Sequence, residues 1–316
     1  MKALATFALA LAAPLALAGP AVAQDKMSVI LDWFVNPDHG PVIIAREKGY
    51  FARNGLSVEI VAPANPTDPP KMVAAGKADL AISYQPQLHL NLHEGMDLVR
   101  VGTLVATPLT CLVTLADGPI KKLSDLAGRK VGFAVPGVQE VLLDAMLGNS
   151  GVAKNAVERV NIGFSISPAL MSRQVEGVIG AFRNFELNQM AIEGIAGKCF
   201  YPEDEGVPAY DELIYVANPK TMNKERTARF LAATELATQF ILNNPKDAWE
   251  LFAATSKELR NELNQRAWND TYPRFASRPA ATEYGRYAKF EEFLFKMGAI
   301  PSRNPVSKLT IDVTAP

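Results

Sequence analysis

The sequence predicts an α/β protein built from two lobes. Strand-like runs rich in Val, Ile and Leu alternate with helical segments over residues 27–217, which is typical of mostly parallel sheets covered by helices on both faces. After Pro219 this alternation gives way to long helical stretches. The chain has 316 residues, which is enough for two separate hydrophobic cores.

The first 23 residues have the pattern of a secretory signal peptide. Lys2 gives a positive start, residues 3–18 form an apolar run, and residues 21–23 read Ala-Val-Ala. The apolar run is shorter than the ~20 residues that span a bilayer. We therefore expect cleavage after Ala23 and a protein free in the periplasm, with a retained N-terminal anchor as the alternative.

Charge and metal-binding residue types argue against several classes of function. The formal net charge is −1 and the basic residues are dispersed, which disfavours binding to nucleic acid or anionic membranes. His89 and His93 share i,i+4 spacing but do not resemble a zinc site, so we expect surface or core roles, with no metal and no cofactor. Cys111 and Cys199 could form one disulfide in an oxidising compartment, and the sequence leaves their pairing open.

The predicted elements follow one another in βαβ order. We expect Asp38 to cap the first helix and Gly49 to end it. The predicted strands cover residues 27–34, 57–62, 78–83, 110–115, 130–135, 159–164, 177–182, 213–217 and 309–313. The predicted helices cover residues 39–48, 68–76, 86–95, 121–128, 139–149, 168–174, 186–193, 224–242, 245–254, 257–270 and 282–297.

Two crossings between the lobes are expected, because the C-terminal helices are predicted to return to the first lobe. We place the crossings near residues 107–108 and 201–211, where prolines occur. Lobe 1 then comprises residues 24–108 and 210–316, and lobe 2 comprises residues 109–209.

Ligands of open α/β sheets bind beyond the carboxyl ends of the strands, where loops meet helix N-termini. That rule selects four loops, at residues 33–39, 83–87, 136–140 and 183–186. Together they offer an aromatic platform, neutral polar groups and a carboxylate, which suits a small-molecule site.

Several segments resemble one family of transport proteins. They are Asp-Trp-Phe-x-Asn-x-Asp-His at 32–39, Glu-x-Gly-Tyr-Phe at 47–51, Gly-Lys-Ala-Asp at 76–79, Ser-Asp-Leu-Ala-Gly-Arg-Lys-Val-Gly at 124–132 and Pro-Ala-Tyr-Asp-Glu-Leu at 208–213. The chain is similar to the ABC-transporter binding proteins for thiamine pyrimidine precursors (ThiY-like), relatives of thiamine pyrimidine synthases. The second and third segments recur in binding proteins for sulfonate and nitrate, so the first segment carries the narrower resemblance.

The resemblance implies a type II periplasmic-binding-protein fold whose two lobes close on a ligand between them. It also implies a formylaminopyrimidine or hydroxymethylpyrimidine as ligand, a membrane permease and an ATPase as partners, and a monomer in the periplasm. The related synthases consume pyridoxal phosphate through a Lys and a His, where this chain has Ser83 and Gln87. Because that amine and imidazole are missing, the enzyme hypothesis is disfavoured.

The first two loops supply the aromatic and neutral polar candidates. Trp33 is predicted to stack on a flat heterocycle, with an ordinary core role as the alternative. Phe34 should alternate to the other face and lie in the core. The remaining candidates of these loops are the hydrogen-bonding groups of Asn36, His39, Ser83 and Tyr84. We expect the helix dipole to keep the His39 imidazole neutral, with a role only in packing as the alternative.

The last two loops supply the residues that are expected to recognise the charge of the ligand. Gly137 opens a helix whose N–H groups would face the cleft, and Glu140 in its first turn opposes an anion, which favours a neutral or amine-bearing ligand. Glu186, with Asn184 beside it, is predicted to pair with the amino group and adjacent ring nitrogen of a pyrimidine. The alternative for Glu186 is interaction with the helix dipole alone.

Two further features of the sequence bear on alternative roles. Arg183 would favour an anionic solute such as a sulfonate or nitrate if its side chain pointed into the cleft; riboflavin or another heterocycle is a further alternative. The acidic stretch Tyr210-Asp211-Glu212 lies at the second crossing, and we expect it to serve the hinge or a permease-docking surface. The sequence contains no recognisable nucleophile–base pair, which disfavours an enzyme.

Overall fold

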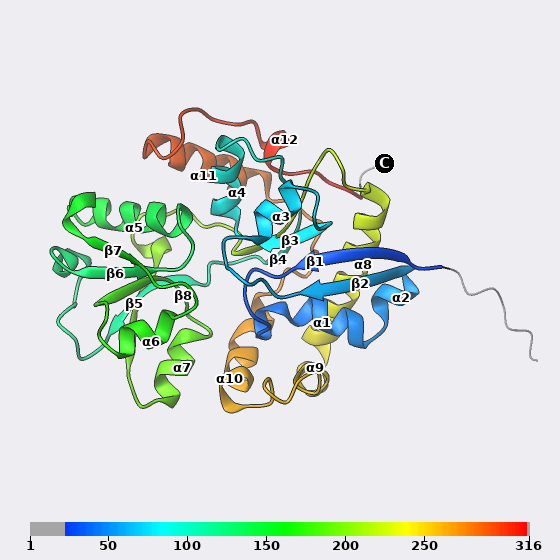
Figure 1. The fold of residues 1–316 in the computed structure, drawn as a ribbon, viewed down its shortest axis with the longest axis horizontal. Coiled ribbons are helices and arrows are strands. Elements are labelled where there is room, and N and C mark those ends of the chain that lie inside the picture. Colours follow the sequence, from blue (N-terminus) through cyan, green and yellow to red (C-terminus); the bar gives the residue numbers. More distant parts are fainter. Residues whose placement is uncertain (1–22, 315–316) are drawn as a thin grey trace, which may run out of the picture.

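A computed structural model describes residues 23–314 of the chain. The signal-peptide prediction rests on residues 1–22, which lie outside the described residues. Within the described part, the predicted α/β class is confirmed: two five-stranded sheets are flanked by helices and lie side by side (Figure 1). We call each sheet with its helices a lobe.

Lobe 1 is built on the sheet with strand order β2-β1-β3-β10-β4. Four of its strands run parallel, and β10 runs antiparallel to both neighbours. Its strands are β1 (Asp25–Ile30), β2 (Leu56–Val61), β3 (Leu80–Ser83), β4 (Val99–Val105) and β10 (Leu213–Ala217). Its helices are α1 (Gly40–Glu47), α2 (Tyr50–Arg53), α3 (Pro69–Ala74), α4 (Gln85–His93), α8 (Lys224–Asn243), α9 (Pro245–Ala253), α10 (Glu262–Thr271), α11 (Tyr284–Lys296) and α12 (Val306–Leu309).

Lobe 2 repeats the pattern with strand order β7-β6-β8-β5-β9. Here β5 is the strand antiparallel to its neighbours β8 and β9. Its strands are β5 (Thr110–Leu115), β6 (Lys130–Phe133), β7 (Glu158–Asn161), β8 (Gly177–Phe182) and β9 (Gly197–Phe200). Its helices are α5 (Val138–Asn149), α6 (Ile166–Met171) and α7 (Glu186–Ile192).

The chain passes between the two sheets twice, from β4 to β5 and from β9 to β10. The C-terminal helices pack on lobe 1, where α8 lies against α1 and α9. Short strand-to-strand passages at residues 106–109 and 201–212 therefore connect the lobes. Among the described residues, none of the helices combines the length and apolarity required for a membrane span.

Cys111 and Cys199 form a disulfide bond, which answers the question that the sequence leaves open. The two residues lie on the adjacent antiparallel strands β5 and β9, with their Cα atoms 5.7 Å apart. The bond joins positions 88 residues apart and fixes β9 to the sheet edge beside β5.

Several predicted elements differ from the structure at their ends, among them the first strand and the helix predicted at 257–270. The first strand stops at Ile30 rather than residue 34, because the chain turns there toward a 3₁₀ helix at Pro37–His39. Phe34 was expected in the core and is instead 43 % exposed. The helix predicted at 257–270 begins only at Glu262, because the Asn261 side chain accepts a hydrogen bond from the Asn264 N–H and caps it there.

One predicted strand is absent from the structure, and two observed strands were not predicted. The strand expected at residues 309–313 is absent; α12 runs through Leu309, and Thr310 forms only an isolated bridge with Arg100. Conversely, β9 and β4 were not predicted. The sequence of β4 reads Val-Arg-Val-Gly-Thr-Leu-Val. Arg100 interrupts its apolar pattern, yet the side chain is fully buried and its guanidinium donates to the carbonyl of Pro279 and the hydroxyl of Thr103.

Candidate functional site

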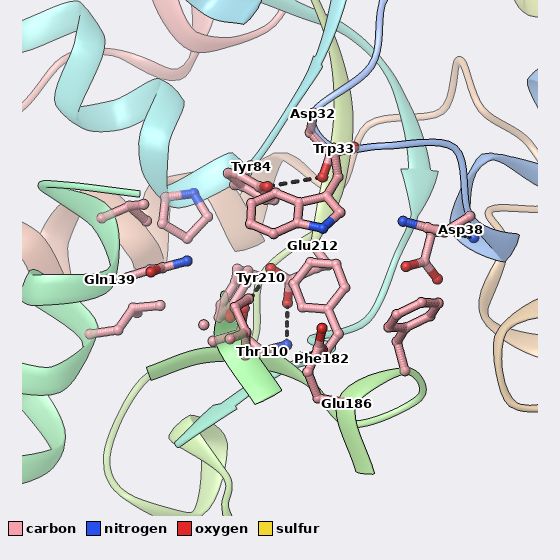
Figure 2. Close-up of a pocket in the computed structure, with 17 residues that line it drawn as sticks. Asp32, Trp33, Asp38, Tyr84, Thr110, Gln139, Phe182, Glu186, Tyr210 and Glu212 are labelled. Carbon is pink, nitrogen blue, oxygen red and sulfur yellow. Dashed lines mark hydrogen bonds between the residues drawn. The ribbon is translucent and has the colours of Figure 1, made fainter. Parts of the chain in front are cut away.

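A cavity lies between the two lobes, at the ends of β1, β3 and β8 and at both crossings. Figure 2 shows Asp32, Trp33 and Tyr84 on one side of it and Tyr210, Phe182 and Glu186 on the other. Its volume is about 30 Å³ in this structure. Its lining consists of Asp32, Trp33, Asn36, Asp38, Tyr84, Pro86, Thr110, Val138, Gln139, Leu142, Ile166, Gly180, Phe182, Phe185, Glu186, Tyr210 and Glu212.

The lining is aromatic and acidic. Four carboxyl groups face it, whereas none of the described residues that line it is a Lys, Arg or His. An anion would therefore meet carboxylates without a compensating cation. A neutral ring that bears N–H donors suits this lining better.

Asp32 is held by two buried hydrogen bonds. Its Oδ2 accepts from the Tyr84 hydroxyl at 2.9 Å, and its Oδ1 lies 2.9 Å from His39 Nε2. The Asn36 N–H donates to His39 Nδ1 at 3.2 Å, so Nδ1 is the acceptor and Nε2 carries the proton that bonds Asp32. The imidazole is thus neutral, and it positions Asp32 from behind the cavity wall.

The turn that creates this arrangement begins at Asn36. The Asn36 side chain accepts from the Asp38 N–H at 2.8 Å, so Asn36, not the predicted Asp38, caps the helical turn. Freed from capping, the Asp38 side chain turns into the cavity wall. His39 is fully buried and does not line the cavity, in line with its predicted packing alternative.

Asp38 joins the two lobes. Its Oδ1 accepts a hydrogen bond from Asn184 Nδ2 at 2.7 Å and lies 3.1 Å from the hydroxyl of Thr271. Asp38 Oδ2 and Asn184 Oδ1 are buried and have no hydrogen-bond partner among the described residues. Burial raises the pKa of Asp38 to about 6.

Glu186 is the first residue of α7 and reaches the cavity from lobe 2. Its Oε2 accepts from the backbone N–H of Phe182 at 2.6 Å, and the residue is buried. Burial, together with the charge of Asp38, raises the pKa of Glu186 to about 8. Glu186 therefore carries a proton at neutral pH and can both donate and accept a hydrogen bond.

Glu212 and Tyr210 line the cavity although they lie at the second crossing. Glu212 Oε2 accepts from the N–H groups of Leu109 and Thr110, at 2.6 and 2.8 Å, and so ties the two crossings together. Burial raises the pKa of Glu212 to about 7. Asp211 between them is also buried, so this stretch lies inside the molecule at the second crossing and offers no exposed docking surface.

Gln139 reaches the cavity because Gly180 leaves room for it. Its Oε1 accepts from the N–H groups of Ala134 and Val135, at 2.7 and 3.1 Å, which leaves the Nε2 end toward the strand β8. A Cβ on Gly180 would lie 2.1 Å from Gln139 Nε2, and Gly180 has φ +94°. Glycine is required there on both counts.

The predicted site residues divide into two groups. Trp33, Asn36, Tyr84 and Glu186 line the cavity between the lobes. The Trp33 ring also packs edge-on against Phe164 of lobe 2, with centroids 4.4 Å apart.

The other predicted residues lie nearby. Ser83 and Gly137 line a neighbouring cavity, and Asn184 reaches the site through its bond to Asp38. Glu140 accepts from the Gly137 N–H at 3.0 Å and lines neither cavity, because it caps its own helix. Arg183 points away from the site, since its guanidinium pairs with Glu203 and donates to the Thr110 carbonyl.

Eight polar or aromatic residues of the lining were not predicted from the sequence. Asp32 is the first residue of the quoted Asp-Trp-Phe segment, and its charge between apolar residues was an available signal. Others become visible only when the lobes are assembled, because they belong to strand ends and crossings far apart in sequence. The missed residues are Asp32, Asp38, Thr110, Gln139, Phe182, Phe185, Tyr210 and Glu212.

Solved structures of binding proteins share this fold at low sequence identity. The alkanesulfonate-binding protein SsuA from Xanthomonas axonopodis has a TM-score of 0.71 and 12 % identity, covering 90 % of this chain and 96 % of that one. The nitrate-binding protein NrtA from Synechocystis has a TM-score of 0.71 and 13 % identity, covering 92 % and 86 %. The fold is thus that of periplasmic substrate-binding proteins, as predicted.

Sequence relatives are more specific. A Haemophilus influenzae protein provisionally named a thiamine biosynthesis protein is 47 % identical, over 93 % of this chain and 94 % of its own. The formylaminopyrimidine-binding protein of Halalkalibacterium halodurans is 33 % identical, over 77 % and 74 %. A Saccharomyces cerevisiae 4-amino-5-hydroxymethyl-2-methylpyrimidine phosphate synthase is 24 % identical, over 81 % and 78 %. The family model described as NMT1/THI5 like matches residues 36–248, and the chain belongs to this family.

Proposed function

We propose that this protein is the periplasmic solute-binding component of an ABC importer and captures a thiamine pyrimidine precursor of the formylaminopyrimidine or hydroxymethylpyrimidine type. The named ligand of the 33 % identical relative supports this ligand class. The fold shared with sulfonate- and nitrate-binding proteins supports a transport role. A permease and an ATPase are the partners that such a role requires.

The observation that carries the proposal is the cation-free, carboxyl-lined cavity between the lobes. An aminopyrimidine presents N–H donors beside ring nitrogens and has two flat faces. Asp38 Oδ2 is a buried acceptor without a partner, and Trp33 and Tyr84 supply aromatic surface. Donor groups of the ligand would relieve the cost of burying that acceptor.

Glu186 is the group we assign to the ring nitrogen. With a pKa of about 8, its carboxyl holds a proton that a basic ring nitrogen can take up on binding. The result is a carboxylate paired with a cationic ring, a charge-assisted interaction stronger than a neutral hydrogen bond. Asp38, near enough to raise the pKa of Glu186, strengthens the preference for a cationic or N–H-rich ligand.

The anion-binding alternative loses its main support. Arg183, the cation that could favour a sulfonate or nitrate, is engaged by Glu203 and stacks on Tyr201, with its guanidinium 4.2 Å from the ring centroid. The synthase alternative would need an amine and an imidazole at the positions that Ser83 and Gln87 occupy. Gln87 instead bonds Asn91, and no lysine lines the lobe cavity among the described residues.

Binding requires the lobes to separate and close again. A cavity of about 30 Å³ has room for little more than water, so a heterocycle cannot enter it without movement of the walls. We propose that residues 24–108 with 210–316 and residues 109–209 move as two bodies about the crossings. The chain would act as a monomer, with closure presenting the liganded form to the permease.

A thermal-shift panel tests the proposal on protein purified from a periplasmic extract. Formylaminopyrimidine should raise the unfolding temperature in proportion to the logarithm of its concentration, whereas taurine and nitrate should not. A shift with taurine and none with the pyrimidine would overturn the ligand class. Mass spectrometry of the same sample tests whether the chain starts at Gln24.

A further inference from the structure

A second cavity adjoins the first and is lined mostly by residues of lobe 1. Its volume is about 220 Å³, and Asp32 and Tyr84 belong to the walls of both cavities. The N-terminal end of α5 is also shared, since Gly137 lines the second cavity and Val138 lines the first. The Tyr84–Asp32 hydrogen bond therefore stands at the boundary between two neighbouring spaces.

Two amide side chains of α4 face this second cavity with half of their hydrogen-bonding capacity unused. Gln87 and Asn91 are 8 % and 1 % exposed and line it together. Gln87 Nε2 donates to Asn91 Oδ1 at 2.7 Å. Gln87 Oε1 and Asn91 Nδ2 then have no partner among the described residues.

The free groups of this amide pair suit one kind of ligand group. If both amides were turned over, Asn91 Nδ2 would donate to Gln87 Oε1 and leave the other oxygen and nitrogen free. Either orientation presents one free acceptor beside one free donor. Unpaired buried amides are unfavourable, so a group that both donates and accepts would satisfy the pair.

The remaining lining sets the charge of that group. The charged residues of this cavity are Lys71 and Glu94, which are exposed at its rim, and Asp32, whose oxygens are both engaged. The inner wall is otherwise formed by apolar and neutral residues, including Ser83 and Ile82. A neutral amide or hydroxyl suits this space, whereas a phosphate or carboxylate does not.

We propose that the second cavity is the subsite for the polar substituent of the ligand. The pyrimidine ring would occupy the cavity between the lobes, and the amide or hydroxyl at its position 5 would reach past Tyr84 to Gln87 and Asn91. This inference rests on the proposed function and deepens it. It assigns recognition of the substituent to residues other than those that read the ring.

Calorimetric titration with three pyrimidines tests the assignment on the periplasmic protein. The ligands share the 4-amino-2-methylpyrimidine ring and carry formylaminomethyl, hydroxymethyl or plain methyl at position 5. Wild-type protein should bind at least one of the first two about 10- to 100-fold more tightly than the methyl compound. The stronger of the two identifies whether an amide or a hydroxyl is the natural group.

The Gln87→Leu/Asn91→Leu double variant should bind all three ligands with similar affinity, close to that of wild type for the methyl compound. Its unfolding temperature should not fall, because the substitution removes both partners of a buried polar pair. Gln87→Met serves if the double variant does not fold, and should reduce the same preference. As a control, Glu186→Gln should weaken all three ligands to the same degree.

The outcomes separate this inference from the function on which it rests. Tight binding of all three pyrimidines to wild type without preference would overturn the subsite and leave the ring site standing. If the double variant kept the preference for the formylaminomethyl or hydroxymethyl compound, that result would also overturn the subsite and leave the ring site standing. Absence of binding by every pyrimidine would overturn the proposed function and the subsite with it.

Discussion

Asn184 of lobe 2 donates a hydrogen bond of 2.7 Å to the Asp38 carboxylate of lobe 1. Each residue retains one buried oxygen without a partner, Asp38 Oδ2 and Asn184 Oδ1. This contact between the lobes therefore also leaves two acceptors available, one from each lobe. This coupling gives a physical reason for closure to depend on a ligand that donates hydrogen bonds.

Asn184→Ala should loosen closure and weaken binding. It removes the bond to Asp38 and the 2.6 Å contact between Asn184 Nδ2 and Thr271 Oγ1, so the formylaminopyrimidine affinity should fall about tenfold. Calorimetry measures the affinity, and X-ray scattering should show a larger radius of gyration without ligand. Asn188→Ala is the matched control, because its bond to exposed Asp270 also joins the lobes but lies outside the cavity lining. Equal losses in the two variants would contradict a special role for Asn184.

Glu186→Gln should stabilise the ligand-free protein at alkaline pH. The pKa of Glu186 is about 8 in the folded protein against the ordinary value of 4.5, so the folded state holds the proton more tightly than the unfolded state. Its contribution to stability is therefore largest below about pH 4.5 and is lost as pH rises toward 8. Glutamine stays neutral, so the variant should match wild type near pH 5 and exceed it near pH 9, by on the order of 3 kcal/mol.

Unfolding midpoints measured across this pH range check the sign. Glu193→Gln is the control, because Glu193 lies exposed just beyond the same helix and outside the cavity. A constant difference between Glu186→Gln and wild type at all pH values would contradict the raised pKa. In the same variant, ligand affinity should fall about 10- to 100-fold, since glutamine cannot transfer a proton to the ring.

Gly180→Ala should destabilise the protein and displace the Gln139 amide from the cavity. The added Cβ would lie 2.1 Å from Gln139 Nε2, on a residue with φ +94°, and together these cost about 1–3 kcal/mol. Gly177→Ala, in the same strand, is the control. Its Cβ would lie no closer than 3.4 Å to a neighbour, and its φ is not positive. Urea unfolding compares the two, and equal stabilities would show that Gly180 is not required.

The disulfide should contribute about 2–5 kcal/mol to the free energy of unfolding. Cys111 and Cys199 are bonded in the structure. Thiol titration of the denatured protein should therefore find no free thiol before reduction and two after it. Cys111→Ala/Cys199→Ala should unfold at lower denaturant concentration, yet retain ligand selectivity because neither cysteine lines the lobe cavity. Two free thiols in protein isolated from the periplasm would contradict the bond.

Strands buried on both faces were the most predictable part of the fold. The ends of β5, β8 and β10 match the predicted ranges, because each is an apolar run bounded by turn-forming or polar residues. β4 was not predicted, because Arg100 is buried through hydrogen bonds to residues far apart in the sequence and nearby, which no local pattern reveals. The short run at residues 309–313 fitted a strand equally well, but Leu309 is the last residue of α12 and Thr310 forms only an isolated bridge.

The site was partly predictable for a related reason. The rule that ligands bind beyond strand ends selects loops, and four predicted residues from three of them do line the cavity. The rule cannot give the direction of a long side chain. Arg183 lies in one of the selected loops, but its guanidinium pairs with Glu203 in the structure. Nor can the rule show that the crossings form a wall of the cavity, which is why Glu212 was expected to serve the hinge or a docking surface and not the site.

The central claim is that the cavity between the lobes binds an amine-bearing pyrimidine. Calorimetric titration of the purified protein with formylaminopyrimidine, beside taurine and riboflavin, tests it most directly. The account predicts saturable 1:1 heat with the pyrimidine and none with taurine or riboflavin. Heat with taurine or riboflavin and none with the pyrimidine would contradict it, because the ligand would then be one that this acidic, narrow cavity should reject.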